Sequence, residues 1–350
     1  MALRFTVLGD PGSDNAVFVW IESGQKISRL LFDCGEGCLA SLPLAEIQAI
    51  DHVFFSHFHM DHISGFDSFF RATYNRTSKP NTIWGPPGAS QIMQHRFQGF
   101  LWNLRHNLAS SWDVHDIYPD RIEATRYLAS EAFAEAHPLP ARPLNTTFNT
   151  PLLATPEYSI QALHMEHLAP SMAYLVREQP RLNVATSRLA ALGLRPGEWL
   201  QAIKWPQPGE APTIEIEGAS YSLADLRREL LTETPGQSLA YLTDFIMDQQ
   251  ARERLASALQ GCAVIICESQ YRHADYELAA RNYHMTATQA AELARLANAQ
   301  QLLLFHLSDR YTKAEWLDLL AEARAIFPNT TFPEGWLSSG AHTGSSGYRA

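Results

Sequence analysis

Short apolar runs separated by turn residues open the chain and predict β-strands. The runs over residues 3–8, 16–21 and 27–33 are each bounded by Gly, Pro, Asp or Ser, which is the pattern of a β-meander. A helical pattern near residues 44–50 leads into the apolar run His52–Ser56, which is short enough for a buried strand. Because sites are often built on loops that follow buried strands, the His-rich segment that comes next is the first candidate site.

Strand and helix patterns continue along the rest of the chain. They predict helices over 63–76, 89–106, 286–299 and 313–326, and strands over 158–164, 172–177, 238–244, 263–268 and 301–305. From 178 to 237 prolines punctuate short helical pieces and the strand rhythm weakens, which indicates an insertion. We therefore divide the chain into a first half over 1–177, the insertion over 178–237, a second half over 238–332, and a tail over 333–350 with the Gly and Ser content of a flexible terminus.

The composition is that of a globular protein with an acidic balance of charge. Of the 350 residues 46% are hydrophobic and 18% charged, which excludes a largely disordered, collagen-like or coiled-coil chain. The net charge of −10 argues against a protein coated in basic charge for nonspecific binding to nucleic acids or membranes. Apolar runs fall far short of the roughly 20 residues of a membrane span, and residues 1–10 lack the plan of a signal peptide, so we expect a cytoplasmic protein without a membrane partner.

The four cysteines are too few for a disulfide scaffold in a chain of this length, which fits a reducing compartment. Cys34 and Cys38 lie close together, but a second pair at metal-binding spacing is missing from the sequence. We therefore expect them to be small buried residues.

Four potential metal ligands fall within six residues: His57, His59, Asp61 and His62. Three His at fixed positions would occur by chance only about 0.02 times in this chain, so a solvated His-rich loop is the weaker interpretation. Alternate residues of an extended chain point the same way, so the first two histidines can converge on one ion while the turn redirects the other two ligands toward a second. Imidazole and carboxylate ligands suit Zn²⁺ best, and Mn²⁺ or Fe²⁺ also accept them.

Further motifs accompany this segment along the chain. They are FDCGEG at 32–37, GPPG at 85–88, HLAPSMAY at 167–174, Thr243-Asp244, ESQY at 268–271, HMTATQAA at 284–291 and FHLSDRY at 305–311. Together with the HxHxDH pattern at 57–62, they resemble the ribonuclease Z branch of the metallo-β-lactamase superfamily in order and spacing. The resemblance implies an α/β fold, a four-layer αββα sandwich made by two similar halves, with metals at one edge.

The resemblance also implies a set of metal ligands. One zinc ion would be held by His57, His59 and His167, a second by Asp61, His62 and His306, and Asp244 would bridge them. His164 is a rival for the third position, but the Pro-Ser-Met-Ala-Tyr context favours the histidine three residues later. Alone, His306 would be interpreted as a satisfied histidine at a strand end. Asp33 and Glu36 are expected to brace the ligand loop.

A mechanism follows from such a centre. Two ions lower the pKa of a shared water from 15.7 toward about 7, so that hydroxide can attack a phosphodiester at neutral pH. Asp61 would accept or orient that water's proton while it ligates metal. His284, whose motif the resemblance puts beside the site, is the candidate general acid for the departing alkoxide. Glu268 is expected to orient it, the alternative for Glu268 being a salt bridge at a strand end.

The sequence thus predicts a dinuclear zinc phosphodiesterase whose family function is endonucleolytic removal of the 3′ trailer from precursor tRNA, and family members often form homodimers. Two features depart from the family: the loop Gly9–Asn15 is short and lacks an arginine, and the insertion lacks the long Gly-Pro-rich arm, so it predicts a reduced arm or a lid. Folded RNA requires phosphate neutralisation. The candidate cations are Arg71, Arg76, Lys79, Arg96, Arg105, Lys204, Arg227 and Arg228.

Two other functions stay open. The acidic charge and the short loop favour a hydrolase that uses the same metal centre on a small substrate, such as a cyclic nucleotide, an organophosphate or another ester. A non-catalytic binding protein on this fold is the third hypothesis, and the intact set of ligands argues against it.

Overall fold

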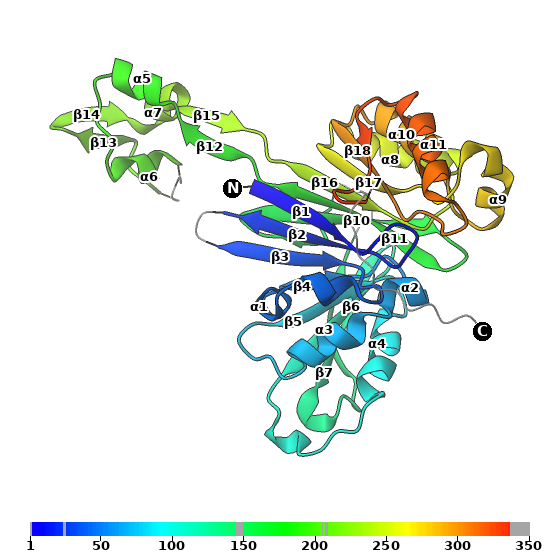
Figure 1. Cartoon of the computed structure of the whole chain (residues 1–350). Helices are drawn as coiled ribbons and strands as arrows, with labels where there is room; N and C mark the ends of the chain where they lie inside the picture. Colours follow the sequence, from blue (N-terminus) through cyan, green and yellow to red (C-terminus); the bar gives the residue numbers. More distant parts are fainter. Residues whose placement is uncertain (1, 24–25, 145–149, 205, 207–208, 337–350) are drawn as a thin grey trace. The chain divides into compact units, whose positions relative to one another are not determined.

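The computed structural model describes residues 2–23, 26–144, 150–204, 206 and 209–336 (Figure 1). The chain divides into two compact units, of which unit 1 comprises Met1–Val176 with Ser238–Ala350 and unit 2 comprises Arg177–Gln237. Within the described ranges, none of the helices has the length and apolar character needed to cross a membrane.

The first sheet of unit 1 has the strand order β1-β2-β3-β4-β5-β6-β7-β8. Its strands are β1 (Ala2–Leu8), β2 (Ala16–Glu22), β3 (Ile27–Phe32), β4 (His52–Phe54), β5 (Asn81–Gly85), β6 (Ser111–Ile117), β7 (Arg121–Leu128) and β8 (His137–Pro143). β1 to β3 are antiparallel, which confirms the predicted meander, and β3 to β6 are parallel. The β5 strand and the last three strands were not predicted from the sequence. β8 contains three prolines, which are tolerated because it forms the edge of the sheet.

The second sheet of unit 1 has the order β19-β18-β17-β16-β11-β10-β9. Its strands are β9 (Leu153–Ala154), β10 (Tyr158–Glu166), β11 (Pro170–Glu178), β16 (Ser238–Leu242), β17 (Val264–Glu268), β18 (Gln301–Phe305) and β19 (Thr330–Thr331). β16 to β19 are parallel, and their continuous apolar runs suit strands that are covered on both faces. The strands predicted in this half are confirmed.

Helices cover the outer faces of both sheets. They are α1 (Leu44–Gln48), α2 (Met60–Ile63), α3 (Phe66–Thr73), α4 (Ala89–Gln98), α8 (Gln249–Ala258), α9 (Tyr276–Arg281), α10 (Ala287–Leu296) and α11 (Lys313–Arg324). The helix predicted over 63–76 is instead divided between α2 and α3 at Gly65, where a Cβ would lie 2.0 Å from the Gly35 carbonyl oxygen. The helix predicted over 89–106 ends at Gln98, since Gly99 caps it.

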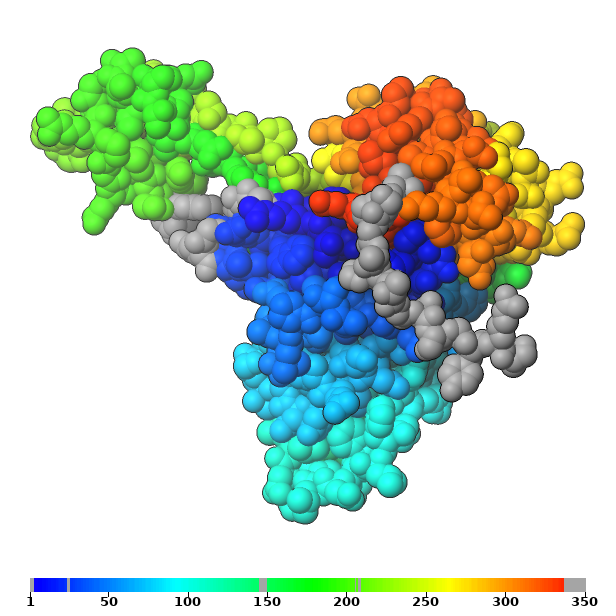
Figure 2. Space-filling model, viewed as in Figure 1, coloured from blue at the N-terminus to red at the C-terminus, as the bar shows by residue number. Residues whose placement is uncertain are grey.

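The alternating side chains of β2 show how the layers are held together. Val17 and Val19 belong to the apolar core that includes residues of both sheets, such as Tyr241 of β16. Phe18 belongs to a second core, with Phe66 of α3 on the outer face of the first sheet. Figure 2 shows the blue N-terminal part of unit 1 between its cyan part and its orange C-terminal part. Unit 1 is therefore a four-layer αββα sandwich, as predicted.

Unit 2 has a core of its own. Its elements are β12 (Arg181–Val184), α5 (Thr186–Ala191), α6 (Trp199–Lys204), β13 (Thr213–Ile216), β14 (Ala219–Ser222), α7 (Leu223–Leu230) and β15 (Leu231–Thr234). β12 pairs with β15 and β13 with β14, both antiparallel. Apolar side chains such as Leu189, Ile203 and Leu226 pack together in its interior. The prolines therefore separate short strands as well as short helices.

The predicted tail over 333–350 lies mostly outside the described residues, which end at 336. Trp336 itself is buried, and its indole N–H donates to the Gly9 carbonyl (3.1 Å).

Candidate metal centre

The candidate residues lie where parallel strands end. Asp33 follows β3, Asp244 lies two residues after β16, Glu268 is the last residue of β17, and His306 follows β18. His57 lies three residues beyond β4, which is parallel to β3. The carboxyl ends of parallel strands meet at one edge of a sheet, and that edge is the usual place for a site in α/β proteins. Segments far apart in the sequence are brought together in this way.

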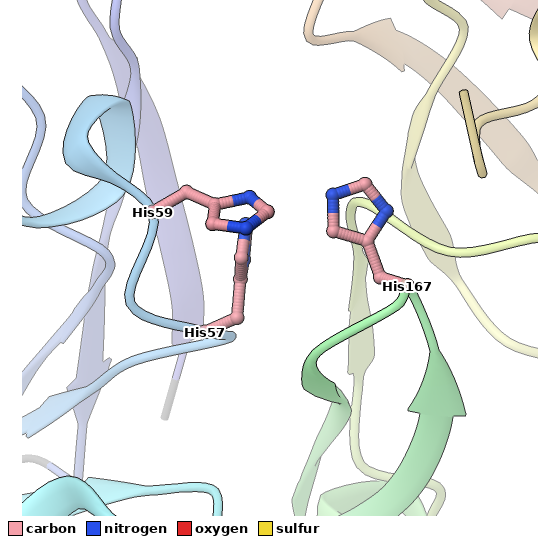
Figure 3. A group of neighbouring side chains, drawn as sticks. All are labelled: His57, His59 and His167. Carbon is pink, nitrogen blue, oxygen red and sulfur yellow. The ribbon is translucent and has the colours of Figure 1, made fainter.

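Three histidines form the first group. His57, His59 and His167 each offer a ring nitrogen, and these atoms lie within 4.8 Å of one another. Figure 3 shows His167, which follows β10, facing the other two rings; its ring centroid lies 5.1 Å from each of theirs. His164, the rival for this position, lies instead against the backbone of Tyr118.

The second group comprises Asp61, His62, Asp244 and His306, whose ligand atoms also lie within 4.8 Å of one another. Asp244 Oδ2 lies 3.4 Å from His62 Nε2 and 3.7 Å from both His57 Nε2 and His167 Nε2. Its Oδ1 lies 3.3 Å from His306 Nδ1. The Asp244 carboxylate thus lies between the two groups, where a bridging ligand belongs.

These groups fit a divalent metal. The Nε2 atoms of His57 and His62 are buried, and within the described part of the chain neither has a hydrogen-bond partner. Four ligand atoms at about 2.0–2.1 Å from one zinc ion lie about 3.4 Å from each other, and the Asp244 Oδ2 to His62 Nε2 distance is 3.4 Å. Burial lowers the pKa of His57 to about 2, which keeps its imidazole neutral and able to donate a lone pair.

A fully buried carboxylate, Asp33, orients two of the histidines. Its Oδ2 accepts hydrogen bonds from His62 Nδ1 (2.7 Å), the Ser56 hydroxyl (2.6 Å) and the Tyr241 hydroxyl (2.7 Å). Because the Ser56 proton is donated to Asp33, the Ser56 oxygen accepts from His57 Nδ1 (3.0 Å). Both imidazoles therefore carry their proton on Nδ1 and present an Nε2 lone pair to the centre.

A bracing role for Asp33 was expected from the sequence, whereas Ser56 and Tyr241 were not expected in this network. The only sequence signal for Tyr241 is a hydroxyl within an otherwise apolar strand, since a buried tyrosine usually requires a partner. Glu36 is exposed, and its backbone N–H donates to Asp14 Oδ2 (2.8 Å), so the structure places it outside this network.

Backbone conformation at the site is unusual. Five residues around the centre are not glycine and have positive φ: Asp33 (56°), Leu168 (57°), Asp244 (51°), Tyr283 (59°) and His306 (50°). Such residues are uncommon and concentrate at functional sites. The carbonyl of Tyr283 accepts a hydrogen bond from His167 Nδ1 (2.8 Å), which leaves Nε2 facing Asp244.

The carboxylates and imidazoles of the centre shift one another's pKa values. Burial alone would raise the pKa of Asp244, but His306 and His62 hold it well below its usual range. Burial alone would lower the pKa of His62, but Asp244 and Asp33 raise it well above its usual range. The carboxylates thus attract a positive charge to this position, and a divalent cation can take the place of the proton.

Glu268 and His284 form a pair beside the metal groups. Glu268 is fully buried, accepts a hydrogen bond from Phe245 N (2.8 Å), and its Oε2 lies 2.9 Å from His284 Nδ1. Burial opposes charge on His284, but the Glu268 carboxylate outweighs it and raises the pKa of His284 to about 9. Because His284 Nδ1 is hydrogen-bonded to Glu268, His284 Nε2 is the ring nitrogen that can deliver a proton.

Most of the candidate cations form hydrogen bonds or ion pairs with other groups of the protein. Arg76 donates to the carbonyls of Gln48 (2.9 Å) and Ile50 (2.6 Å), and Lys79 pairs with Asp51 (2.7 Å). The other engaged pairs are Arg96 with Asp67, Arg227 with Glu210 and Arg228 with Asp225. The acidic partners therefore offset much of the charge that these side chains could offer to a phosphate.

Three comparisons place the chain among known proteins. Residues 15–185 match the family model described as anti-Pycsar protein Apyc1. The ribonuclease Z of Deinococcus radiodurans is 45% identical over 335 residues, which covers 96% of this chain and 99% of that protein.

Two solved structures share the fold. The metallo-β-lactamase fold protein YhfI from Bacillus subtilis superposes with a TM-score of 0.53 at 17% identity, covering 94% of each chain. The short form of human tRNase Z superposes with a TM-score of 0.51 at 18% identity, covering 89% of this chain and 94% of that one.

Proposed function

The chain belongs to the ribonuclease Z family and is a metal-dependent phosphodiesterase, and we propose that it removes the 3′ trailer from precursor tRNA. The observation that carries this proposal is the 45% identity to a ribonuclease Z over nearly the whole length of both proteins. In addition, the candidate ligands from both halves of unit 1 surround a single carboxylate, Asp244.

We assign the metal ligands as follows. One Zn²⁺ would be held by His57, His59 and His167, a second by Asp61, His62 and His306, and Asp244 would be shared between them. When bound, the ions supply activation of water and neutralisation of charge on the phosphoryl oxygens. Mn²⁺ and Fe²⁺ fit the same donors.

Side chains of the protein accept and donate the protons of the reaction. The Asp61 carboxylate is half-exposed, and its Oδ2 lies 3.3 Å from both His62 Nε2 and His306 Nε2. Burial alone would raise the pKa of Asp61, but the neighbouring His306 and His62 outweigh burial and lower it, so Asp61 is an ionised acceptor for the proton of the attacking water. His284, fixed by Glu268, protonates the leaving oxygen.

A small phosphodiester, such as a cyclic nucleotide, is the second candidate substrate. Two observations favour it: the net charge of −10 and the internal pairing of most candidate cations. Unit 2 carries seven Lys or Arg against eight Asp or Glu, so by charge alone it does not attract RNA. If tRNA is the substrate, unit 2 must bind it largely by shape.

One experiment separates the two candidates. Zinc-loaded protein is given a precursor tRNA with a 3′ trailer and, separately, bis(p-nitrophenyl) phosphate. We expect a single cut at the trailer junction, lost in Asp244→Ala. Turnover of the small diester without any cut in the tRNA would replace the tRNA proposal with the small-substrate one.

Three further points belong to the proposal. Unit 2 is proposed as a reduced substrate-binding arm or lid. A variant that lacks residues 178–237, given the same precursor tRNA, tests this role. A homodimer is proposed from family membership, and light scattering on the purified protein tests it. The cytoplasm is proposed as the compartment, because all four cysteines are free and buried.

A further inference from the structure

Two large apolar side chains next to the metal groups are exposed to solvent. Met60 is 81% exposed and Leu168 is 75% exposed. Single exposed apolar residues are common and need no explanation. These two differ because each directly follows a proposed metal ligand, His59 in one case and His167 in the other.

The two residues come from the two different halves of unit 1. Met60 is the first residue of α2 and comes from the first sheet's side, whereas Leu168 lies in the turn between β10 and β11 of the second sheet. The rings of the preceding histidines face each other with centroids 5.1 Å apart (Figure 3). Met60 and Leu168 are therefore exposed apolar residues that each adjoin one of two facing ligand side chains.

The conformation of Leu168 is itself unfavourable. Its φ of 57° is a left-handed conformation that Gly or Asn adopts with little strain and a leucine does not. The Glu166 carboxylate accepts a hydrogen bond from the Leu168 N–H (3.2 Å) and fixes this turn. A leucine here is both strained and solvent-exposed, and a contact made with bound substrate would offset both costs.

We propose that Met60 and Leu168 form an apolar clamp that holds the nucleobase flanking the scissile phosphate. This inference rests on the proposed phosphodiesterase function. In a nucleic-acid substrate, the base is attached through its sugar to the reacting phosphate. It is therefore the planar apolar group of the substrate that lies nearest to the metal centre. The thioether of Met60 contacts aromatic rings favourably, and contact with a ring face is tolerant of base identity because every base presents one.

The experiment uses variants that leave the fold and metal centre unchanged. Met60→Gln keeps an unbranched side chain and helix propensity, and Leu168→Asn suits the left-handed conformation. Leu44→Gln is the matched control, because Leu44 is also an exposed apolar residue at the start of a helix, α1, that contributes none of the clustered ligands. Zinc content is measured for every variant.

Two substrates isolate the contact with the base: uridylyl-(3′→5′)-uridine, and the same diester without its bases. With the dinucleotide, we expect each clamp variant to lose about 5- to 20-fold in kcat/KM, mainly through KM, as expected for one lost stacking contact. With the abasic diester, and for the Leu44 control on both substrates, we expect changes within about two-fold.

The outcomes are distinguishable. Equal losses on both substrates, no loss on either, or turnover of bis(p-nitrophenyl) phosphate by the wild type without turnover of the dinucleotide would overturn the clamp alone. Failure of the wild type on bis(p-nitrophenyl) phosphate as well would overturn the proposed function, and the clamp with it.

Discussion

The His62 imidazole donates from Nδ1 to the buried Asp33 carboxylate over 2.7 Å, although the two residues are 29 positions apart in the sequence. The link exists because β3 and β4 are parallel neighbours whose carboxyl ends lie together. A carboxylate behind a metal-binding histidine fixes the ring and increases its basicity. Asp33 therefore acts on the proposed metal centre without belonging to it.

Replacing Asp33 with Asn should weaken metal binding while preserving the fold. Asn has nearly the same shape and tolerates the left-handed backbone of this position (φ 56°). We expect zinc affinity to fall about 10- to 100-fold, as measured by competition with a chelator. Asp51→Asn, remote from the ligand groups, is the control, and equal affinities in the two variants would contradict the role of Asp33.

Asp244→Asn should reduce both metal content and activity. The carboxylate is within 3.7 Å of histidines from both ligand groups, so the substitution removes a charge that both ions would share. We expect kcat/KM on bis(p-nitrophenyl) phosphate to fall at least about 100-fold. Elemental analysis of the purified variant reports the metal bound per chain. A fully active variant with wild-type metal content would refute the assignment of Asp244.

His284→Ala should affect poor leaving groups more than good ones. A leaving alkoxide needs a proton, whereas p-nitrophenolate departs without one. We expect a loss of about 10²- to 10⁴-fold on a diester with an alkoxide leaving group and a much smaller loss on the nitrophenyl diester. Glu268→Gln should give a weaker effect in the same direction, because it leaves the imidazole in place but less well oriented. Equal losses on both substrates would exclude a general acid.

Stability should fall as the pH decreases below about 6.5, in part because of two buried histidines beside Trp84. Burial lowers the pKa of His52 and of His115 to about 4. The His115 ring stacks on Trp84 with centroids 3.8 Å apart, and the Trp84 indole N–H donates to His52 Nδ1 (3.4 Å). Since these groups bind a proton in the unfolded chain before they do so in the folded one, their contribution is complete above pH 6.5 and is lost toward pH 4.

Urea unfolding between pH 7 and pH 5 measures this effect. Full protonation would cost about 3 kcal/mol of unfolding free energy per histidine. His115→Phe keeps the stacked ring and should make the pH dependence shallower, whereas His106→Phe, at an exposed position, should not. If the unfolding free energies of His115→Phe and of the wild type depend on pH in the same way, His115 does not contribute to the loss of stability at low pH.

Local patterns in the sequence were sufficient for the family, for nine strands of unit 1, and for the ligand segment. The apolar run at 301–305 is a strand at those residues, because a run buried on both faces has few alternatives. The segment 57–62 could be recognised because its candidate ligands are neighbours in the chain. Individual Gly and Pro residues explain two of the errors. Gly65 divides one predicted helix into two, and the prolines of β8 concealed an edge strand.

What the sequence determined by itself is therefore the chemistry available: the fold family, the histidines and carboxylates, and the order in which strands present them. Tertiary structure decided which of these meet. It brought His167 rather than His164 to the other histidines, joined Asp33 to Tyr241 across 208 residues, and gave five of the eight candidate cations a hydrogen-bond or ion-pair partner within the protein. The reason is that such contacts depend on the alignment of strand ends between two sheets, which periodicity along one strand does not encode.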